Sequence, residues 1–265
     1  MEAYLNFIVK MKSNFKKNGV FLVLGLTIAV FYSCNKDDDI NDGNISKITA
    51  TNVINGSSQI TTVKVLVYWE RGDDYGSDAI AQTKYENNGF TVEFPSTVAA
   101  KYLYLVSEDA PQDISISDKN ANVLAISDIE GYDKDENGIG YFYLEEVRDD
   151  SEYYTFWFYT DRDVSIKGEA KYIDDNYEDM ENYDLKLKKG WNVVYQNYTE
   201  SYNNSTKRDV YTYSITSQKP SGINYLWNFY GNYDFRSAQM TTKSVENTKS
   251  VFSKLKENKK NRTRK

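Results

Sequence analysis

Apolar and polar side chains alternate with a period of two along most of residues 45–235. The clearest runs lie at residues 63–69, 90–94, 153–160, 164–171 and 191–196. Because successive side chains of a strand point to opposite faces, this pattern predicts strands with one buried face. The same runs are rich in β-branched and aromatic residues, which favour strands.

Weaker runs of the same kind raise the expected total to about a dozen short strands. They lie at residues 46–53, 79–86, 101–106, 123–129, 140–146, 183–187, 210–217 and 225–230. No substantial helix is expected before residue 241. Short strands at this spacing predict an all-β fold, an antiparallel β-sandwich that is immunoglobulin-like or jelly-roll-like. Two small sandwiches that divide near Asp149 and Asp150 are the alternative.

Three turns separate neighbouring runs: Asn87-Asn88-Gly89, Asp161-Arg162-Asp163 and Lys188-Lys189-Gly190. Short loops with Gly or Asn are typical of hairpins, so we expect the strands on either side to be antiparallel neighbours. Trp69, Trp157 and Trp191 fall inside the alternating runs and are expected in the core.

Composition excludes several kinds of chemistry. The 265 residues contain no His and one Cys, Cys34, which rules out a Ser-His-Asp triad, a His-ligated metal and an internal disulfide. The net charge of −7 is uneven, because residues 241–265 hold nine Lys or Arg against two Glu, and residues 1–33 hold four Lys against one Glu. The body between them is strongly acidic and is not expected to bind nucleic acid, whose phosphates attract Lys and Arg.

Residues 12–34 have the layout of an export signal. Lys12, Lys16 and Lys17 precede an apolar run from 20 to 31, and Ser33 precedes Cys34. Residues 19–33 are shorter than the ~20 residues that a membrane-spanning helix needs. The segment resembles a bacterial lipoprotein signal, in which cleavage occurs before a cysteine that is then lipidated. Met1 and Met11 are both open as the start of the chain.

Lys36, Asp37, Asp38 and Asp39 follow the cysteine directly. This run resembles the export tag of surface lipoproteins from Bacteroidetes-type bacteria, although a solvated linker is the alternative. The resemblance implies a removed signal peptide (1–33), an acidic flexible tether (34–44) and a palmitate-type lipid anchor on Cys34. It also implies an outer-membrane location that faces the cell exterior.

The body resembles uncharacterised Bacteroidetes lipoproteins of all-β build. The stretches that carry the resemblance are 87–95, 116–121, 161–168 and 187–195, within about 45–228. They are structural hairpin motifs, so the resemblance implies a fold and a setting but no activity, cofactor or catalytic residue. We expect one β-sandwich domain at 45–236 and a basic, mostly disordered tail at 237–265.

One acidic loop matches the opening of a calcium-binding loop. Asp133, Asp135 and Asn137 supply oxygens at the first, third and fifth positions, and Gly138 stands at the sixth. The twelfth position is Leu144 instead of Glu, so an acidic hairpin tip is the preferred interpretation. No metal site is therefore expected.

Aromatic side chains near the end of the body favour binding. Tyr225, Trp227, Tyr230 and Tyr233 are the candidate ligand-stacking residues, with core packing as the alternative for half of them. The preferred hypothesis is a non-enzymatic, lipid-anchored surface module that binds a glycan or a protein. The alternatives are a carbohydrate-active hydrolase that uses a carboxylate pair and an accessory subunit of an outer-membrane uptake complex.

Overall fold

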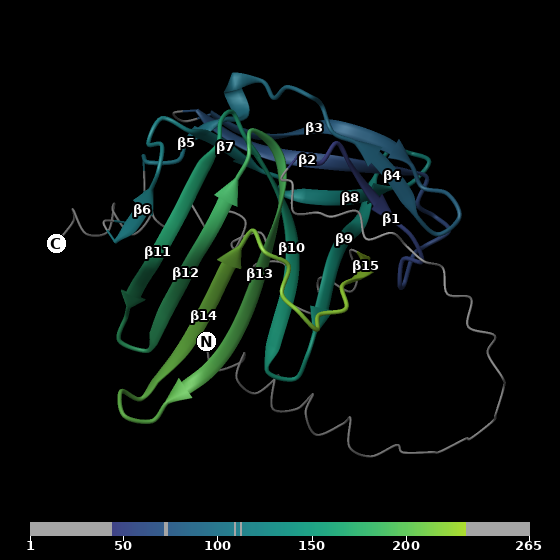
Figure 1. Ribbon diagram of the computed structural model, residues 1–265. Coiled ribbons are helices and arrows are strands. Elements are labelled where there is room, and N and C mark those ends of the chain that lie inside the picture. The colour runs from purple at the N-terminus through teal and green to yellow at the C-terminus, as the bar shows by residue number, and fades with distance from the viewer. Residues whose placement is uncertain (1–43, 72–73, 109, 112, 232–265) are drawn as a thin grey trace, which may run out of the picture. The chain divides into compact units, whose positions relative to one another are not determined.

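The computed structural model describes residues 44–231 apart from 72–73, 109 and 112 (Figure 1). All of them fall within one unit of the chain, Asp39–Lys265. The signal segment, Cys34, the acidic run 36–39, Tyr233 and the tail from 237 lie outside the described residues. None of the described helical residues forms a helix long and apolar enough to cross a membrane.

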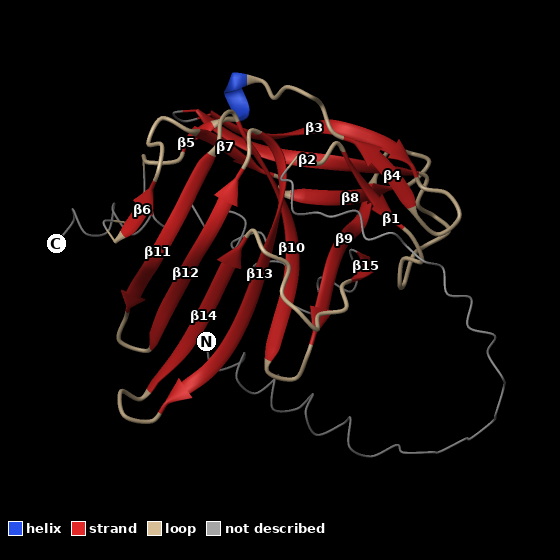
Figure 2. Cartoon of the chain, in the orientation of Figure 1, coloured by secondary structure: helices blue, strands red, loops and turns tan. Residues whose placement is uncertain are grey.

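Strands dominate the described residues, and the single short helical element is a 3₁₀ turn, Ala100–Tyr102 (Figure 2). The prediction of an all-β, sandwich-like fold is confirmed. The strands are β1 (Lys47–Ala50), β2 (Thr62–Arg71), β3 (Asp74–Lys84), β4 (Phe90–Glu93), β5 (Tyr104–Leu105), β6 (Ile114–Ile116), β7 (Asn122–Ala125), β8 (Asp128–Tyr132), β9 (Gly138–Val147), β10 (Ser151–Thr160), β11 (Val164–Ile173), β12 (Tyr177–Leu187), β13 (Gly190–Asn203), β14 (Arg208–Thr216) and β15 (Leu226–Gly231).

One 13-stranded sheet carries most of these strands, in the order β3-β2-β8-β9-β10-β13-β14-β12-β11-β6. β15 adds to β9, β7 adds to β10, and β5 adds to β7. A second sheet contains β1 and β4 alone. Pairing is antiparallel except between β12 and β14, which run parallel. Asp149 and Asp150 lie in the turn between the paired strands β9 and β10, so the large sheet continues without a break at this point.

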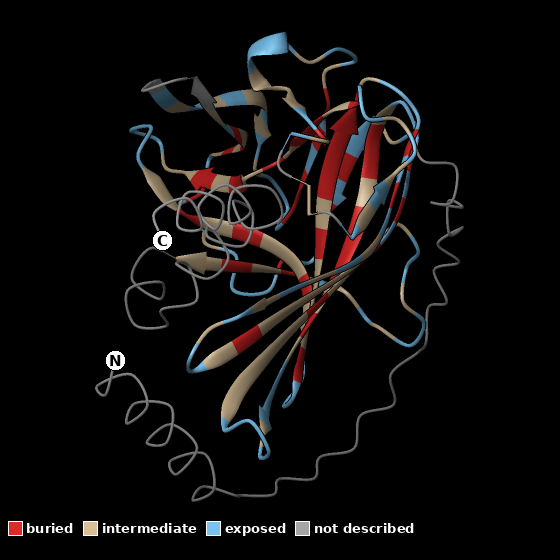
Figure 3. Cartoon of the chain, turned by 90° about the vertical axis from the view of Figure 1, so that its left-hand side faces the viewer, coloured by how far each residue is buried: buried red, intermediate tan, exposed pale blue. Residues whose placement is uncertain are grey.

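The large sheet buries apolar side chains on both faces, at different places. On one face, Trp157, Trp191 and the valines of β2 pack against β1 and β4. On the opposite face, Phe158, Leu185 and their neighbours pack against Val106, Ala121 and Val123 of the segment around β5 and β7. Buried positions become sparser toward the far ends of the long strands (Figure 3).

The three predicted hairpins are wrong. β4 pairs with β1 instead of β3. β10 pairs with β7, β9 and β13, but not with β11. β14 lies between β12 and β13. Hairpins instead join β2 to β3, β8 to β9, β9 to β10, β11 to β12, and β13 to β14.

Local turn chemistry explains the error. Asn87 and Asn88 both adopt the left-handed conformation, and Glu86 and Gly89 exchange backbone hydrogen bonds of 3.0 Å, as in a tight hairpin turn. The chain then leaves the sheet, because Phe90 and Val92 bury their side chains in the core over β2. A tight turn reverses the chain but does not determine which strand becomes its neighbour.

The other two turns bind each other instead of closing hairpins. The carboxylate of Asp163 accepts a hydrogen bond from the backbone nitrogen of Lys189 at 2.9 Å. The ammonium group of Lys188 lies 2.9 Å from the same carboxylate. The connection from β10 to β11 and the connection from β12 to β13 therefore meet at one end of the sheet.

The tryptophan predictions are confirmed for two residues of three. Trp191 is buried, stacks on Phe94 at a centroid distance of 4.4 Å, and donates from Nε1 to the Pro95 carbonyl at 2.9 Å. Trp157 is also buried in this core. Trp69 is only half-buried near the edge of the sheet, with Lys101 over its ring, so its assignment to the core is wrong.

Candidate functional site

The stacking residues predicted near the end of the body do not share one surface. Trp227 is buried, with its ring parallel to that of Trp157 at 5.8 Å and its Nε1 donating to the Thr49 carbonyl at 3.2 Å. It is a core residue, so its prediction as a ligand-stacking residue is wrong. Tyr225 is half-buried against Tyr195 on the same face of the sheet.

Tyr230, the remaining described candidate, lies on the opposite face of the sheet, because its side chain alternates with those of Trp227 and Phe229 along β15. Its hydroxyl donates to a carboxylate oxygen of Glu145. Tyr230 and Glu145 belong to a larger group of tyrosines and acids on this face, which was not predicted from the sequence.

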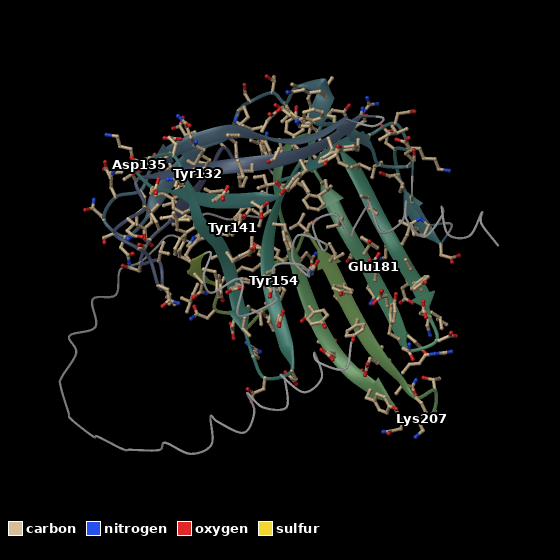
Figure 4. The ribbon with its side chains drawn as sticks, turned by 180° about the vertical axis from the view of Figure 1, so that it is seen from behind. Tyr132, Asp135, Tyr141, Tyr154, Glu181 and Lys207 are labelled. Carbon is tan, nitrogen blue, oxygen red and sulfur yellow. The ribbon has the colours of Figure 1, made fainter. Side chains whose placement is uncertain are left out.

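The acidic loop at 133–138 forms the hairpin tip between β8 and β9. Asp133 Oδ1 accepts hydrogen bonds from the backbone nitrogens of Asp135 and Asn137, both at 2.9 Å. These bonds lower the pKa of Asp133. Lys134 lies 2.7 Å from the Asp135 carboxylate, at the tip labelled in Figure 4. These contacts support the interpretation as a turn, and the described residues contain no group of three or more acidic or Cys side chains placed to hold a metal ion.

Tyrosines and carboxylates follow one face of the large sheet across seven strands and β15. We call this surface the tyrosine face. Strand register places on it Asp128, Glu130, Tyr132, Tyr141, Tyr143, Glu145, Glu152, Tyr154, Tyr172, Tyr177, Asp179, Glu181, Tyr183, Tyr198, Glu200, Tyr202, Asp209, Tyr211, Tyr213 and Tyr230. Figure 4 shows Tyr141, Tyr154 and Glu181 at successive positions across the sheet.

Four aromatic contacts join β11, β12, β14 and β13 on this face. The ring centroids lie 5.8 Å apart for Tyr172 and Tyr177, and 6.2 Å apart for Tyr177 and Tyr211. The ring of Tyr198 lies 6.4 Å from that of Tyr211 and 5.2 Å from that of Tyr213. These separations are typical of interacting aromatic pairs, so the rings form one continuous layer.

Each of several strands also pairs a tyrosine with an acid two residues away. Tyrosine hydroxyls donate to the carboxylate of the i±2 residue for Tyr132 and Glu130 (2.6 Å), Tyr154 and Glu152 (2.7 Å), Tyr183 and Glu181 (2.6 Å), Tyr172 and Asp174 (3.1 Å), and Tyr198 and Glu200 (3.4 Å). Residues two apart on a strand share a face, so the motif Tyr-x-acid or acid-x-Tyr is the sequence signal for this surface.

Burial and like charge raise the pKa values of two carboxyl groups on this face. Desolvation, with the nearby charge of Glu152, raises the pKa of Glu145 to about 7, although the hydrogen bond from Tyr230 acts in the opposite direction. Desolvation, with the charge of Glu130, raises the pKa of Asp128 to about 6. Burial and nearby acids also raise the pKa of Tyr141 to about 12, so its phenol stays protonated at neutral pH.

Glu145 and Glu152 are diagonal neighbours on the adjacent strands β9 and β10. Glu145 is directly opposite Tyr154, and Glu152 lies two residues before Tyr154 on β10. On the other side of Tyr154, the amide nitrogen of Gln196 is buried and has no hydrogen-bond partner among the described residues. The arrangement therefore combines acceptors, phenol donors and one unpaired amide donor on neighbouring strands.

The chain matches no protein-family model and has no significant match among curated proteins or solved structures.

Proposed function

We propose that this protein is a lipid-anchored module of the outer membrane, displayed on the cell exterior, that binds a ligand without transforming it. The signal-like segment that ends at Cys34, together with Lys36 and the three acids that follow, supports this setting. Two or more acyl chains on the cysteine would anchor it stably, whereas one chain would not.

The proposed ligand is a glycan, bound across the tyrosine face. The observation that carries this proposal is the run of half-buried rings Tyr172, Tyr177 and Tyr211, set among carboxylates and supported underneath by the buried rings of Tyr198 and Tyr213. Aromatic faces pack against the C–H faces of sugars, and carboxylates accept hydrogen bonds from sugar hydroxyls. No single pocket is needed for this mode, because an extended chain of sugars can follow the strands.

A glycan array tests this proposal with the full chain carrying Cys34→Ser. We expect binding to a subset of glycans and at least a tenfold loss for Tyr177→Ala, which removes one ring from the layer (roughly 1.4 kcal/mol). Tyr75→Ala is the matched control, because Tyr75 is 83% exposed and belongs to no described ring pair. Equal binding by both variants, with unchanged melting temperatures, would remove the tyrosine face as the binding site.

A second candidate is glycoside hydrolysis by Glu145 and Glu152. Hydrolases of this kind use one carboxyl group as an acid and a second as a nucleophile or base, and their pKa values are set apart by the environment. The raised pKa of Glu145 beside Glu152 fits this requirement. Release of a chromophore from aryl glycosides by the parent chain, abolished separately by Glu145→Gln and Glu152→Gln, would favour the enzyme over the binding module.

A further inference from the structure

The tyrosine face carries a large surplus of negative charge. Its acids are Asp128, Glu130, Glu145, Glu152, Asp179, Glu181, Glu200 and Asp209. In the described strands, basic side chains reach this face only on β2 and β3, as Lys64 and Lys84. Lys64 is already paired with Glu136 at 2.5 Å. Such a field attracts a cationic partner over a distance of about one Debye length.

The chain itself supplies a segment of opposite charge. Residues 241–265 hold nine Lys or Arg against two Glu, with Val251, Phe252 and Leu255 among them. This segment begins ten residues after Gly231, the last residue of β15. β15 contributes Tyr230 to the tyrosine face, so the last described strand ends at the tyrosine face.

The length of chain after β15 is sufficient for the segment to reach the far strands. Ten extended residues span at most about 33–36 Å. Strands lie about 4.8 Å apart, so crossing from β15 through β9, β10, β13 and β14 to β12 needs roughly 25 Å. Gly231 is opposite Gly140, and the register places Glu200 nine residues farther along the strands, which adds roughly 30 Å in that direction. The direct distance is therefore about 39 Å, which is beyond residue 241 but within reach of Lys243 and the basic residues after it, without any rearrangement of the described strands.

We infer that the basic segment 241–265 docks on the tyrosine face of its own chain. Lys and Arg stems pack on the tyrosine rings while their charged ends bind Asp179, Glu181 and Glu200. The carboxylates of Glu181 and Glu200, which bind the phenols of Tyr183 and Tyr198, each have two oxygens and can accept further hydrogen bonds. This inference uses the face of the proposed function but does not depend on its ligand.

Spin-label distances in the full Cys34→Ser chain test the docking. One label is placed in the segment by Ser253→Cys and the other on the tyrosine face by Tyr202→Cys, because Tyr202 is 53% exposed beside Glu200. Ile173→Cys is the matched control site, 50% exposed on the opposite face of β11. We expect a narrow, short distance distribution for the pair 253 and 202. The distribution should become broad after Asp179→Asn, Glu181→Gln and Glu200→Gln, and in about 1 M salt, where screening acts within ~3 Å.

Two outcomes would overturn the inference. A broad distribution that is insensitive to salt and to the three substitutions shows that the segment does not dock on this face. A short distance that disappears when labelled chains are diluted with excess unlabelled chain shows that the occupant is the segment of a second copy. Neither measurement involves a glycan, so failure here leaves the proposed glycan binding to be judged by its own experiment.

Discussion

The hydroxyl of Tyr154 donates a hydrogen bond of 2.7 Å to the carboxylate of Glu152, two residues earlier on the same face of β10. The same relationship recurs on β8, β12 and β13. A carboxylate on a half-buried sheet face needs hydrogen-bond donors in place of the water that burial removes. A phenol two residues away on the same strand can supply one of them. The repeat therefore explains how one sheet face can hold many acids with few bases.

Tyr154→Phe tests how much one such pair contributes to the stability of the fold. The substitution keeps the ring but leaves the Glu152 carboxylate without its phenol donor, so we expect a loss of about 1–2 kcal/mol in the free energy of unfolding. Urea melts at pH 7 measure it, with Tyr75→Phe as the control because Tyr75 is exposed. Equal midpoints for the two variants would show that water replaces the phenol at no cost.

Stability should fall as pH rises through the titration of Glu145. Its pKa is raised from 4.5 in the unfolded chain to about 7 in the fold. The folded state therefore binds more protons than the unfolded state between these values, and stability decreases from about pH 4.5 to pH 7. Glu145→Gln removes this titration. The free energy of unfolding of the variant, relative to that of the parent chain, should therefore increase by about 2 kcal/mol between pH 5 and pH 8.

Urea melts of both chains at pH 5 and pH 8 check this prediction. The comparison between the two chains cancels the titration of the other groups, including Asp128, whose pKa is raised to about 6. A difference between parent and variant that does not change with pH would mean that Glu145 titrates normally in the fold.

The strands were predictable from sequence because alternation records burial directly. The runs at 63–69, 153–160 and 164–171 lie within β2, β10 and β11. The order of strands was not predictable, since β14 enters between β12 and β13 from later in the chain. A local turn such as Lys188-Lys189-Gly190 does not indicate that a strand beginning 18 residues later, at Arg208, will lie between its two neighbours.

The candidate site was predictable only in part, for a related reason. Alternation in β15 shows that Trp227 and Tyr230 point to opposite faces, but not which face meets β1 and β4. Trp227 therefore looked as suitable for a ligand as Tyr230. The acid-x-Tyr spacing is visible in the sequence at 130–132, 152–154 and 181–183, yet its members become one surface only through the pairing of distant strands.

Cys34→Ala tests the anchoring that the proposed function requires. Acyl chains attach through the cysteine thiol, so the variant should incorporate no fatty-acid label and should keep its precursor length. Metabolic labelling with an alkyne fatty acid, followed by membrane fractionation, measures both properties. Ser33→Ala is the control, since a small residue before the cysteine is preserved. Equal labelling of the Cys34→Ala chain and its parent would exclude a lipid anchor at this position.

Trp191→Ala should be the most damaging substitution of those considered, because the indole links both sheets. The ring of Trp191 stacks on Phe94, next to β4, and lies edge-on to Tyr159 of β10 at a centroid distance of 5.4 Å. Removing it leaves a cavity between the sheets and leaves the Pro95 carbonyl without its donor. Such losses typically cost about 3–5 kcal/mol.

Lys188→Ala is the surface control for the Trp191→Ala variant. Lys188 is three residues earlier, with its side chain 61% exposed and paired to an equally exposed Asp163. Water screens an exposed ion pair of this kind, so this variant should melt close to the parent chain. Urea melts of both variants in the Cys34→Ser chain separate the two cases. Near-equal midpoints would mean that the β1–β4 sheet does not depend on Trp191, and the packing of the two sheets described above would have to be revised.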